Sequence, residues 1–254
     1  MTLYICLQGG LGNQLFQYAA ARMTKGVIIK APFAHSGRDY RGSLFNRVES
    51  IEECPKDVRI LGLESFPKWA PEDYVFSTDT VLRGYFQYLP AIQSILPQIS
   101  QDITTFLAAH RDDMRSKYGI QNPSSVGFMH VRRGDYLTAP PNLHWIMPIT
   151  YYTNALTKFD KPLRWFVLSD DIAWCKEQDA FTEFSNVTII DEPDELNGLA
   201  LMSLCHGGAI IANSTYSWWG AALGAENAGG PVVYPSKWFS FDKPDLFPSH
   251  WIRL

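Results

Sequence analysis

The amino-acid sequence predicts an α/β fold in which parallel strands alternate with helices. After residue 122, short apolar runs of strand length alternate regularly with segments of helical periodicity. This order is typical of a parallel sheet with helices on both faces. Near the amino terminus, an apolar run, a glycine-rich turn and a helical pattern form a further strand–turn–helix unit. The 254 residues are enough for one large domain or two smaller ones.

The first strand is expected at Leu3–Leu7, and a helix is expected to begin near Gly12. Between them, Gly10 and Gly12 would let a ligand approach the backbone, and the helix amino terminus would favour an anion. The turn has neither the Gly-Lys-Ser/Thr of a Walker A loop nor a GxGxxG pattern. An ordinary tight turn therefore explains it equally well.

The rest of the first half alternates less regularly. Strands are expected at Val27–Lys30 and Val81–Tyr85, and one long amphipathic helix is expected over Ala91–His110. Residues 31–71 have poor periodicity and several prolines, so we expect loops there. His35 and Asp39 belong to a polar cluster in this region and are candidate acceptor contacts, although solvated surface is the alternative.

The second half begins after Asn122-Pro-Ser-Ser, which would divide the chain into domains 1–122 and 123–254. The expected strands are Val126–His130, Arg164–Ser169, Val187–Ile190, Ala209–Ala212 and Val232–Tyr234. The expected helices are Thr150–Phe159, Ile172–Phe181, Asp194–Cys205 and Tyr216–Ala225. Such alternation implies a parallel sheet wound on both faces.

Composition limits the possible function classes. Hydrophobic residues make up 46% of the chain and charged residues 19%, as in a globular protein. The net charge of −4 argues against broad nucleic-acid binding. No run of 18 apolar residues predicts a membrane span, although peripheral association stays open. The first residues do not have the pattern of a secretory signal peptide, so a cytoplasmic location is expected. The four cysteines have no zinc-binding spacing, and three of them lie in apolar runs and are expected to be buried.

An abrupt change from apolar to polar residues marks the end of the strand at Val126–His130. His130, Arg132, Arg133 and Asp135 follow this buried run. In open α/β sheets, ligands bind at the carboxyl ends of strands. Because guanidinium groups bind phosphate or carboxylate oxygens in a bidentate manner, the pattern predicts an anionic ligand. Arg–Asp pairs that only hold a loop together are the alternative.

Two other strands of the second half also end in polar residues. Asp170 and Asp171 follow one strand, and a serine- and threonine-rich segment follows another, with Asn213, Ser214, Thr215 and Ser217 at the start of a helix. Hydroxyl groups and backbone N–H groups there could bind phosphate, although ordinary helix capping is the alternative. The two adjacent aspartates lack a third carboxylate at metal-binding spacing, so Asp170 is expected to cap a helix or bind the ligand.

Five motifs occur in one order along nearly the whole chain. They are GGLGNQLFQYA at 9–19, GYFQ at 84–87, HVRRGDY at 130–136, SDD at 169–171 and IIANSTYSWWGAAL at 210–223. In this combination the sequence resembles the bacterial α-1,2-fucosyltransferases of glycosyltransferase family 11. The resemblance implies a GT-B-like architecture of two Rossmann-like halves with parallel sheets and GDP-fucose between them. It also implies inverting transfer of L-fucose to the 2-hydroxyl of a galactose, with no cofactor and no essential metal.

The resemblance also implies roles for individual residues. Arg132 would hold the β-phosphate of the donor with His130 beside it, and Asn13 would face the donor from the other half. Ser214, Thr215, Ser217 and Trp218 would form the remaining wall on the GDP side. Relatives often have an acidic residue suited to guanine just before the LMSLC run, where this chain has Gly198. Whether Asp194, Glu195 or Asn197 replaces it stays open.

The acceptor hydroxyl must lose a proton during such a transfer, so a base is needed. Asp135 is the first candidate. The other candidates are His35, Asp39 and His144, and His144 is a candidate acceptor contact as well. Orientation of Arg132 or Arg133 is an equally good explanation for Asp135. Residues 31–71 look short for the family, which leaves the identity of the acceptor open.

Overall fold

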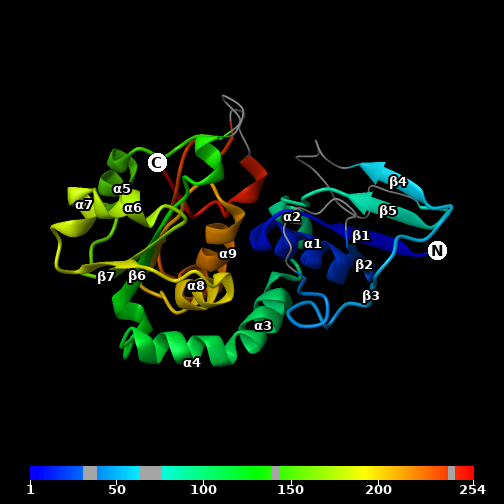
Figure 1. Cartoon of the computed structure of the whole chain (residues 1–254), viewed down its shortest axis with the longest axis horizontal. Coiled ribbons are helices and arrows are strands. Elements are labelled where there is room, and N and C mark those ends of the chain that lie inside the picture. The colour runs from blue at the N-terminus through cyan, green and yellow to red at the C-terminus, as the bar shows by residue number, and fades with distance from the viewer. Residues whose placement is uncertain (31–38, 63–75, 139–143, 240–243) are drawn as a thin grey trace. The chain divides into compact units, whose positions relative to one another are not determined.

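The computed structural model describes residues 1–30, 39–62, 76–138, 144–239 and 244–254 (Figure 1). They form two compact units, each with its own sheet. Unit 1 comprises Met1–Phe106 and Pro244–Pro248, and unit 2 comprises Leu107–Lys243 and Ser249–Leu254. The division does not fall after residue 122, because helix α4, Ala108–Lys117, packs against a helix of unit 2, α8, Glu195–Ser203.

Unit 1 contains a five-stranded parallel sheet in the order β3-β2-β1-β5-β4. Its strands are β1 Leu3–Leu7, β2 Val27–Lys30, β3 Ser50–Ile51, β4 Arg59–Gly62 and β5 Thr80–Arg83. The central strands are apolar and buried, as Ile5, Ile28 and Leu82 illustrate. The predicted bounds of β1 and β2 are confirmed. β3 and β4 were not expected, because they are short edge strands without a buried apolar face.

Helix α1, Leu11–Thr24, follows the glycine turn as predicted and ends at Lys25 in the left-handed conformation with φ of 53°. The prediction of a single helix over Ala91–His110 is wrong. The chain there forms α2 Leu89–Ile92, α3 Leu96–Phe106 and α4. Pro97 has no backbone N–H and lies in the first turn of α3, where no donor is needed.

Unit 2 contains a six-stranded parallel sheet in the order β11-β10-β9-β6-β7-β8. Its strands are β6 Val126–Val131, β7 Arg164–Ser169, β8 Val187–Ile190, β9 Gly208–Ile210, β10 Val232–Tyr234 and β11 Ile252–Arg253. Every residue of β6 is buried, in agreement with its continuous apolar sequence. The five expected strands are found, and only β11, with two residues, was missed.

The helices of unit 2 are α5 Ile149–Leu156, α6 Ile172–Lys176, α7 Asp179–Thr182, α8 and α9 Thr215–Leu223. One helix was expected over Ile172–Phe181, but the extended backbone of Gln178 separates α6 from α7. One core cluster contains Trp165 of β7, Tyr152 of α5 and Phe181 of α7. Together with the buried helices α8 and α9, this core fixes the strand ends that carry the polar residues.

Candidate active site

The carboxyl ends of three neighbouring strands bring the predicted polar residues of unit 2 together. β9, β6 and β7 are adjacent and parallel, with Met129 of β6 paired to Ile210 and to Val167. Because parallel strands end at the same edge, the segments after them lie side by side. The polar segments after β9, β6 and β7 therefore share one edge of the sheet of unit 2.

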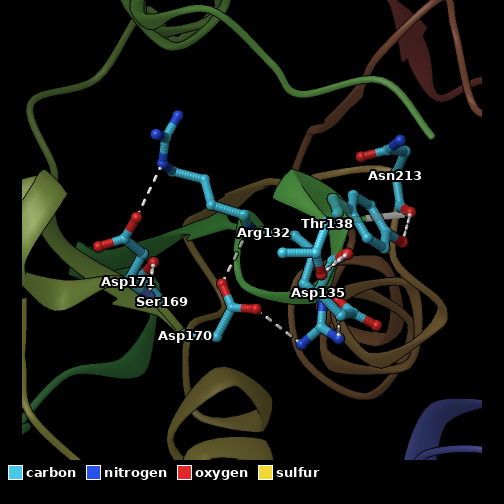
Figure 2. Close-up of polar contacts among 9 residues, drawn as sticks. Arg132, Asp135, Thr138, Ser169, Asp170, Asp171 and Asn213 are labelled. Atoms are coloured by element: carbon cyan, nitrogen blue, oxygen red, sulfur yellow. Dashed lines mark hydrogen bonds and ion pairs between the residues drawn. The ribbon is translucent and has the colours of Figure 1, made fainter. Parts of the chain in front are cut away.

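Two carboxylates hold the side chain of Arg132 (Figure 2). Its Nη1 lies 2.9 Å from Oδ2 of Asp170, and its Nη2 lies 2.6 Å from Oδ1 of Asp135. The guanidinium group also lies 5.4 Å from the centre of the Tyr136 ring. These ion pairs fix the guanidinium group in position. The side chain of Arg132 is 32% exposed, so it still reaches solvent. Such a preorganised cation suits an anionic ligand.

Asp170 also holds the backbone of the loop after β6. Its Oδ1 accepts a hydrogen bond of 2.9 Å from the backbone N–H of Arg133. A Cβ atom on Gly134 would lie 2.5 Å from Oδ2 of Asp170, so only glycine fits there without a shift. Asp170 was expected to cap a helix or to contact the ligand. The structure shows it fixing the loop that carries Arg132, and the cap of α6 is its neighbour Asp171, so only the contact with the ligand stays a prediction.

The neighbouring Arg133 points to a different part of unit 2. Its Nε donates to Asp171 at 3.0 Å, and its guanidinium group lies 4.2 Å from the Trp174 ring centre. Asp171 is the amino-terminal cap of α6, because Oδ1 accepts the backbone N–H of Trp174 at 3.0 Å. That hydrogen bond, followed by the contact with Arg133, lowers the pKa of Asp171. Arg133 therefore packs against α6 and stabilises its start.

His130 is a buried, neutral histidine at the end of β6. Burial, followed by the nearby positive charge of Arg132, lowers the pKa of His130 to about 3, and Asp170 partly opposes this shift. Its Nδ1 is buried and has no hydrogen-bond partner among the described residues. Its ring makes an edge contact of 5.7 Å with Tyr216. His130 therefore lies close to Arg132 without adding positive charge at neutral pH.

Asn213, at the end of β9, links three segments of unit 2. Its Nδ2 donates to the carbonyl oxygens of Trp145 and Trp238, at 2.9 and 3.0 Å. The backbone carbonyl oxygen of Asn213 accepts a hydrogen bond of 2.8 Å from the hydroxyl group of Tyr136. The Oδ1 atom is buried and has no hydrogen-bond partner in the described part of the chain. The side-chain nitrogen of Asn213 thus fixes loops, which leaves only the oxygen for a ligand.

Helix α9 begins directly after Asn213. Ser214 is its amino-terminal cap and makes no side-chain capping bond. The hydroxyl group of Ser217 donates to the Ser214 carbonyl oxygen at 3.0 Å and is fully buried. Trp218 is also fully buried and contacts Trp251. Ser214 and Thr215 are therefore the partly exposed members of the predicted wall, while Ser217 and Trp218 lie in the core.

His144 lies against the loop that carries Arg132. Its ring stacks on Tyr136 with a centroid distance of 4.1 Å and an interplanar angle of 5°. Burial lowers the pKa of His144, while Asp135 raises it and Arg132 lowers it further. The structure thus brings one predicted acceptor contact close to Arg132 and Asp135. No property of the sequence indicated this stacking.

The glycine turn of unit 1 is held by two glutamines of α1. Gly9 has φ of 77°, a conformation that favours glycine. Nε2 of Gln14 donates to the Gly9 carbonyl oxygen at 2.9 Å. The buried Gln17 accepts from the backbone N–H of Gln8 at 2.9 Å and donates to the Gly84 carbonyl oxygen at 3.0 Å. These glutamines therefore maintain the shape of the turn, a role that the sequence analysis missed.

The profile of glycosyltransferase family 11 matches residues 7–252. The chain belongs to this family. It is therefore a glycosyltransferase of the fucosyltransferase type, and the match includes the strand-end segments of unit 2 and the glycine turn of unit 1.

Similar proteins include transferases that act in bacteria and in mammals. The O-antigen biosynthesis glycosyltransferase WbnK of Escherichia coli is 30% identical, over 99% of this chain and all of that protein. An α-1,2-colitosyltransferase of Escherichia coli is 27% identical, over 98% of this chain and 97% of its own length. Galactoside α-(1,2)-fucosyltransferase 1 of Bos taurus is 27% identical, over 73% of this chain and 57% of its own length.

Solved structures agree on the fold of this family 11 glycosyltransferase. The fucosyltransferase NodZ from Bradyrhizobium matches with a TM-score of 0.51 at 13% identity, over 88% of this chain and 92% of that chain. A family 9 glycosyltransferase from Veillonella parvula matches with a TM-score of 0.50 at 11% identity, over 100% and 86% of the two chains. At such low identity the likeness concerns the fold alone. The predicted GT-B-like class, with two Rossmann-like halves, is confirmed.

Among the other predicted acceptor contacts, Asp39 makes ion pairs within its own loop. Its Oδ2 lies 2.6 Å from Nη2 of Arg41, a buried arginine that also contacts Glu52 at 3.0 Å. The hydrogen bond with Asp39, followed by that with Glu52, raises the pKa of Arg41. Asp39 therefore holds a loop of unit 1 in place. His35 lies outside the described residues.

The three candidates for guanine recognition lie at the start of α8. Asp194 caps this helix by accepting the backbone N–H groups of Leu196 and Asn197, at 2.8 and 3.0 Å. Asn197 contacts Nδ1 of His110 at 2.7 Å. The carbonyl oxygen of Glu195 accepts a hydrogen bond of 2.6 Å from the hydroxyl group of Tyr216. Asp194 and Asn197 are thus held by local contacts, and the carboxylate of Glu195 is not part of the Tyr216 bond.

Two structural features are absent from the described residues. No group of three or more His, Cys, Asp or Glu side chains in those residues is placed to hold a metal ion. No helix within the same residues is long and apolar enough to cross a membrane. The three cysteines expected to be buried, Cys6, Cys175 and Cys205, are buried free thiols.

Proposed function

We propose that this glycosyltransferase moves L-fucose from GDP-fucose to the 2-hydroxyl of a terminal galactose in a glycan, with inversion at the anomeric carbon. The observation that carries the proposal is the side chain of Arg132, fixed by Asp170 and Asp135 at the edge of the sheet where α9 also begins. A nucleotide sugar must release a diphosphate, and a fixed arginine next to a helix amino terminus stabilises that charge. As the diphosphate leaves, the sugar passes through an oxocarbenium-like transition state.

Relatives support the choice of sugar and linkage. Two of the similar proteins are named for α-1,2 transfer, one of fucose to galactosides and one of colitose. Among the carboxylates and histidines proposed as the base, Asp135 and His144 lie together in unit 2 next to Arg132. We assign the base to one of these two and keep Asn13 of unit 1 as a donor contact. No cofactor or essential metal is assigned.

Transfer of colitose is the second candidate, because an Escherichia coli colitosyltransferase is 27% identical over nearly the whole chain. Colitose is L-fucose without the 3-hydroxyl group. A site that hydrogen-bonds this hydroxyl would discriminate strongly against colitose, whereas a site that does not would accept both sugars. The two donors therefore give a clean comparison.

Incubation with GDP-fucose or GDP-colitose and a panel of galactosides tests the proposal. The panel includes lactose and the type 1 and type 2 disaccharides, and NMR of the product reads the linkage and the anomeric configuration. We expect an α-1,2-fucosylated galactoside, formed equally well in the presence of EDTA. Faster turnover of GDP-colitose would favour the second candidate. Binding of GDP without turnover of either donor would show a non-catalytic nucleotide-sugar module.

A further inference from the structure

A buried glutamine lies beside the glycine turn of unit 1. Gln87 is in the loop after β5, and only 7% of its surface is exposed. Its Nε2 donates to Oδ1 of Asn13 at 3.0 Å. Asn13 is in the first turn of α1, where its backbone N–H donates to the Gly10 carbonyl oxygen. One side-chain bond therefore links the predicted donor contact to a segment more than seventy residues away.

The loop that carries Gln87 has a constrained backbone. Phe86 has φ of 50°, which is costly for a residue other than glycine. The backbone N–H of Tyr88 donates to the Phe86 carbonyl oxygen at 2.9 Å, so a tight turn closes around Gln87. Gln17 holds the start of the loop through the Gly84 carbonyl oxygen. Two hydrogen bonds thus attach the loop to α1, one at Gly84 and one at Gln87.

The bond from Gln87 also fixes which end of the Asn13 carboxamide faces which way. The oxygen of a carboxamide only accepts hydrogen bonds, and the nitrogen only donates them. Because Gln87 presents a donor, Oδ1 of Asn13 faces Gln87 and Nδ2 faces the opposite side. That side is the glycine turn, where a Cβ on Gly9 would lie 2.8 Å from Nδ2 of Asn13. The opposite orientation would put an acceptor over the turn.

We propose that Gln87 is a positioning residue that orients the Asn13 carboxamide so that its N–H donor faces the glycine turn. A donor in that place suits the oxygen-rich part of a sugar nucleotide, either a phosphate or a sugar hydroxyl. The proposal rests on the proposed function, in which Asn13 contacts the donor. Gln87 acts through Asn13 and does not itself touch the substrate.

A double-mutant cycle tests whether Gln87 acts through Asn13. Transfer is measured as kcat/KM for the sugar-nucleotide donor in the wild type, Gln87→Ala, Asn13→Ala and the double variant. We expect Gln87→Ala to lower kcat/KM about fivefold to tenfold, the effect of one lost hydrogen bond. In the Asn13→Ala background we expect the same substitution to change kcat/KM less than about twofold. An equal loss in both backgrounds would overturn the proposal.

Gln14→Ala is the matched control for the cycle. Gln14 is also buried, and its Nε2 donates a bond of 2.9 Å in the same turn to the Gly9 carbonyl oxygen. Its substitution should lower kcat/KM by the same factor with or without Asn13→Ala. If Gln14→Ala were as strongly coupled to Asn13 as Gln87→Ala, a general loss of turn structure would explain both, and the specific role would be refuted.

Gln87→Glu separates orientation from packing. Glutamate has nearly the same shape but a carboxylate only accepts, so the bond survives only if Asn13 turns its nitrogen towards it. Positioning therefore predicts that Gln87→Glu loses at least as much activity as Gln87→Ala, with a smaller drop in Tm. A packing role predicts that Gln87→Glu keeps more activity than Gln87→Ala. A wild type without transfer from any sugar nucleotide would instead refute the proposed function itself.

Discussion

Substituting the two adjacent arginines after β6 separates catalysis from stability. Arg132→Ala and Arg133→Ala remove the same group from neighbouring positions in one loop, so each is the control for the other. Arg132 contacts Asp170 and Asp135, which reach solvent at the candidate site. Arg133 contacts Asp171 and Trp174 at the start of α6. We expect the first substitution to reduce the rate and the second to reduce the free energy of unfolding.

The contacts of Arg132 give the size of its effects. Its partners are 25% and 66% exposed, and solvent-exposed ion pairs contribute about 0–1 kcal/mol each. Arg132→Ala should therefore lower the free energy of unfolding by no more than about 1–2 kcal/mol. Loss of one preorganised donor to a developing charge costs about 10²–10³ in rate. We expect a loss in kcat of that order.

Arg133 has the opposite balance. It is 16% exposed, it pairs with the residue that caps α6, and it lies over an indole ring. The cation–π contact alone is worth about 0.5–2 kcal/mol, and the alkyl part of the side chain adds packing. We expect Arg133→Ala to destabilise the protein by about 2 kcal/mol and to lower the rate less than about tenfold.

Urea unfolding and initial rates of transfer, measured on the same preparations, check both parts. Rates are taken at a temperature where both variants are fully folded. If Arg132→Ala kept more than half of the wild-type rate, the assignment of Arg132 to the diphosphate would be wrong. If Arg133→Ala lost more rate than Arg132→Ala while staying folded, the two roles would have to be exchanged.

Three more predictions concern β6 and the loop that follows it. Asp135→Asn should slow transfer to the acceptor more than hydrolysis of the donor, and unchanged transfer would exclude Asp135 as the base. Gly134→Ala should displace Asp170, because the new Cβ would lie 2.5 Å from its Oδ2, and should lower kcat with little change in circular dichroism. His130 has a pKa lowered to about 3, so folding favours its neutral form, and stability falls as the pH drops below the ordinary value. Between pH 7.5 and 5 the titration of His130 should lower the free energy of unfolding by about 2 kcal/mol. Urea unfolding should show this loss in the wild type and not in His130→Gln.

The strands of unit 2 could be predicted because burial on both faces leaves a continuous apolar sequence. β7, β8 and β10 have the predicted bounds. In unit 1, β3 and β4 are short and partly exposed, so their sequences have no comparable signal. The prediction of one helix over Ala91–His110 was wrong for another reason. The apolar spacing continues from α3 into α4, so periodicity does not detect the break in the backbone between these helices.

The candidate site was predicted as a set of strand ends, and the structure supplies what connects them. The parallel order of the sheet makes Arg132 and Asp170 neighbours, and that part follows from the alternation of strands and helices. The hydrogen bond from Gln87 to Asn13 and the stacking of His144 on Tyr136 join residues from separate loops. The periodicity of a single sequence does not indicate such long-range pairs.

The two carboxylates on Arg132 do not prevent it from binding an anion, because they are held with unequal strength. Asp170 accepts a second hydrogen bond from the backbone N–H of Arg133 and is the less exposed of the two. Asp135 is 66% exposed, and its carboxylate has no second donor among the described residues. An anion that approaches Arg132 should therefore displace Asp135 and leave the bond to Asp170 in place. Asp170→Asn should then weaken donor binding more than Asp135→Asn does, and isothermal titration with GDP would contradict this ordering if the two variants bound equally well.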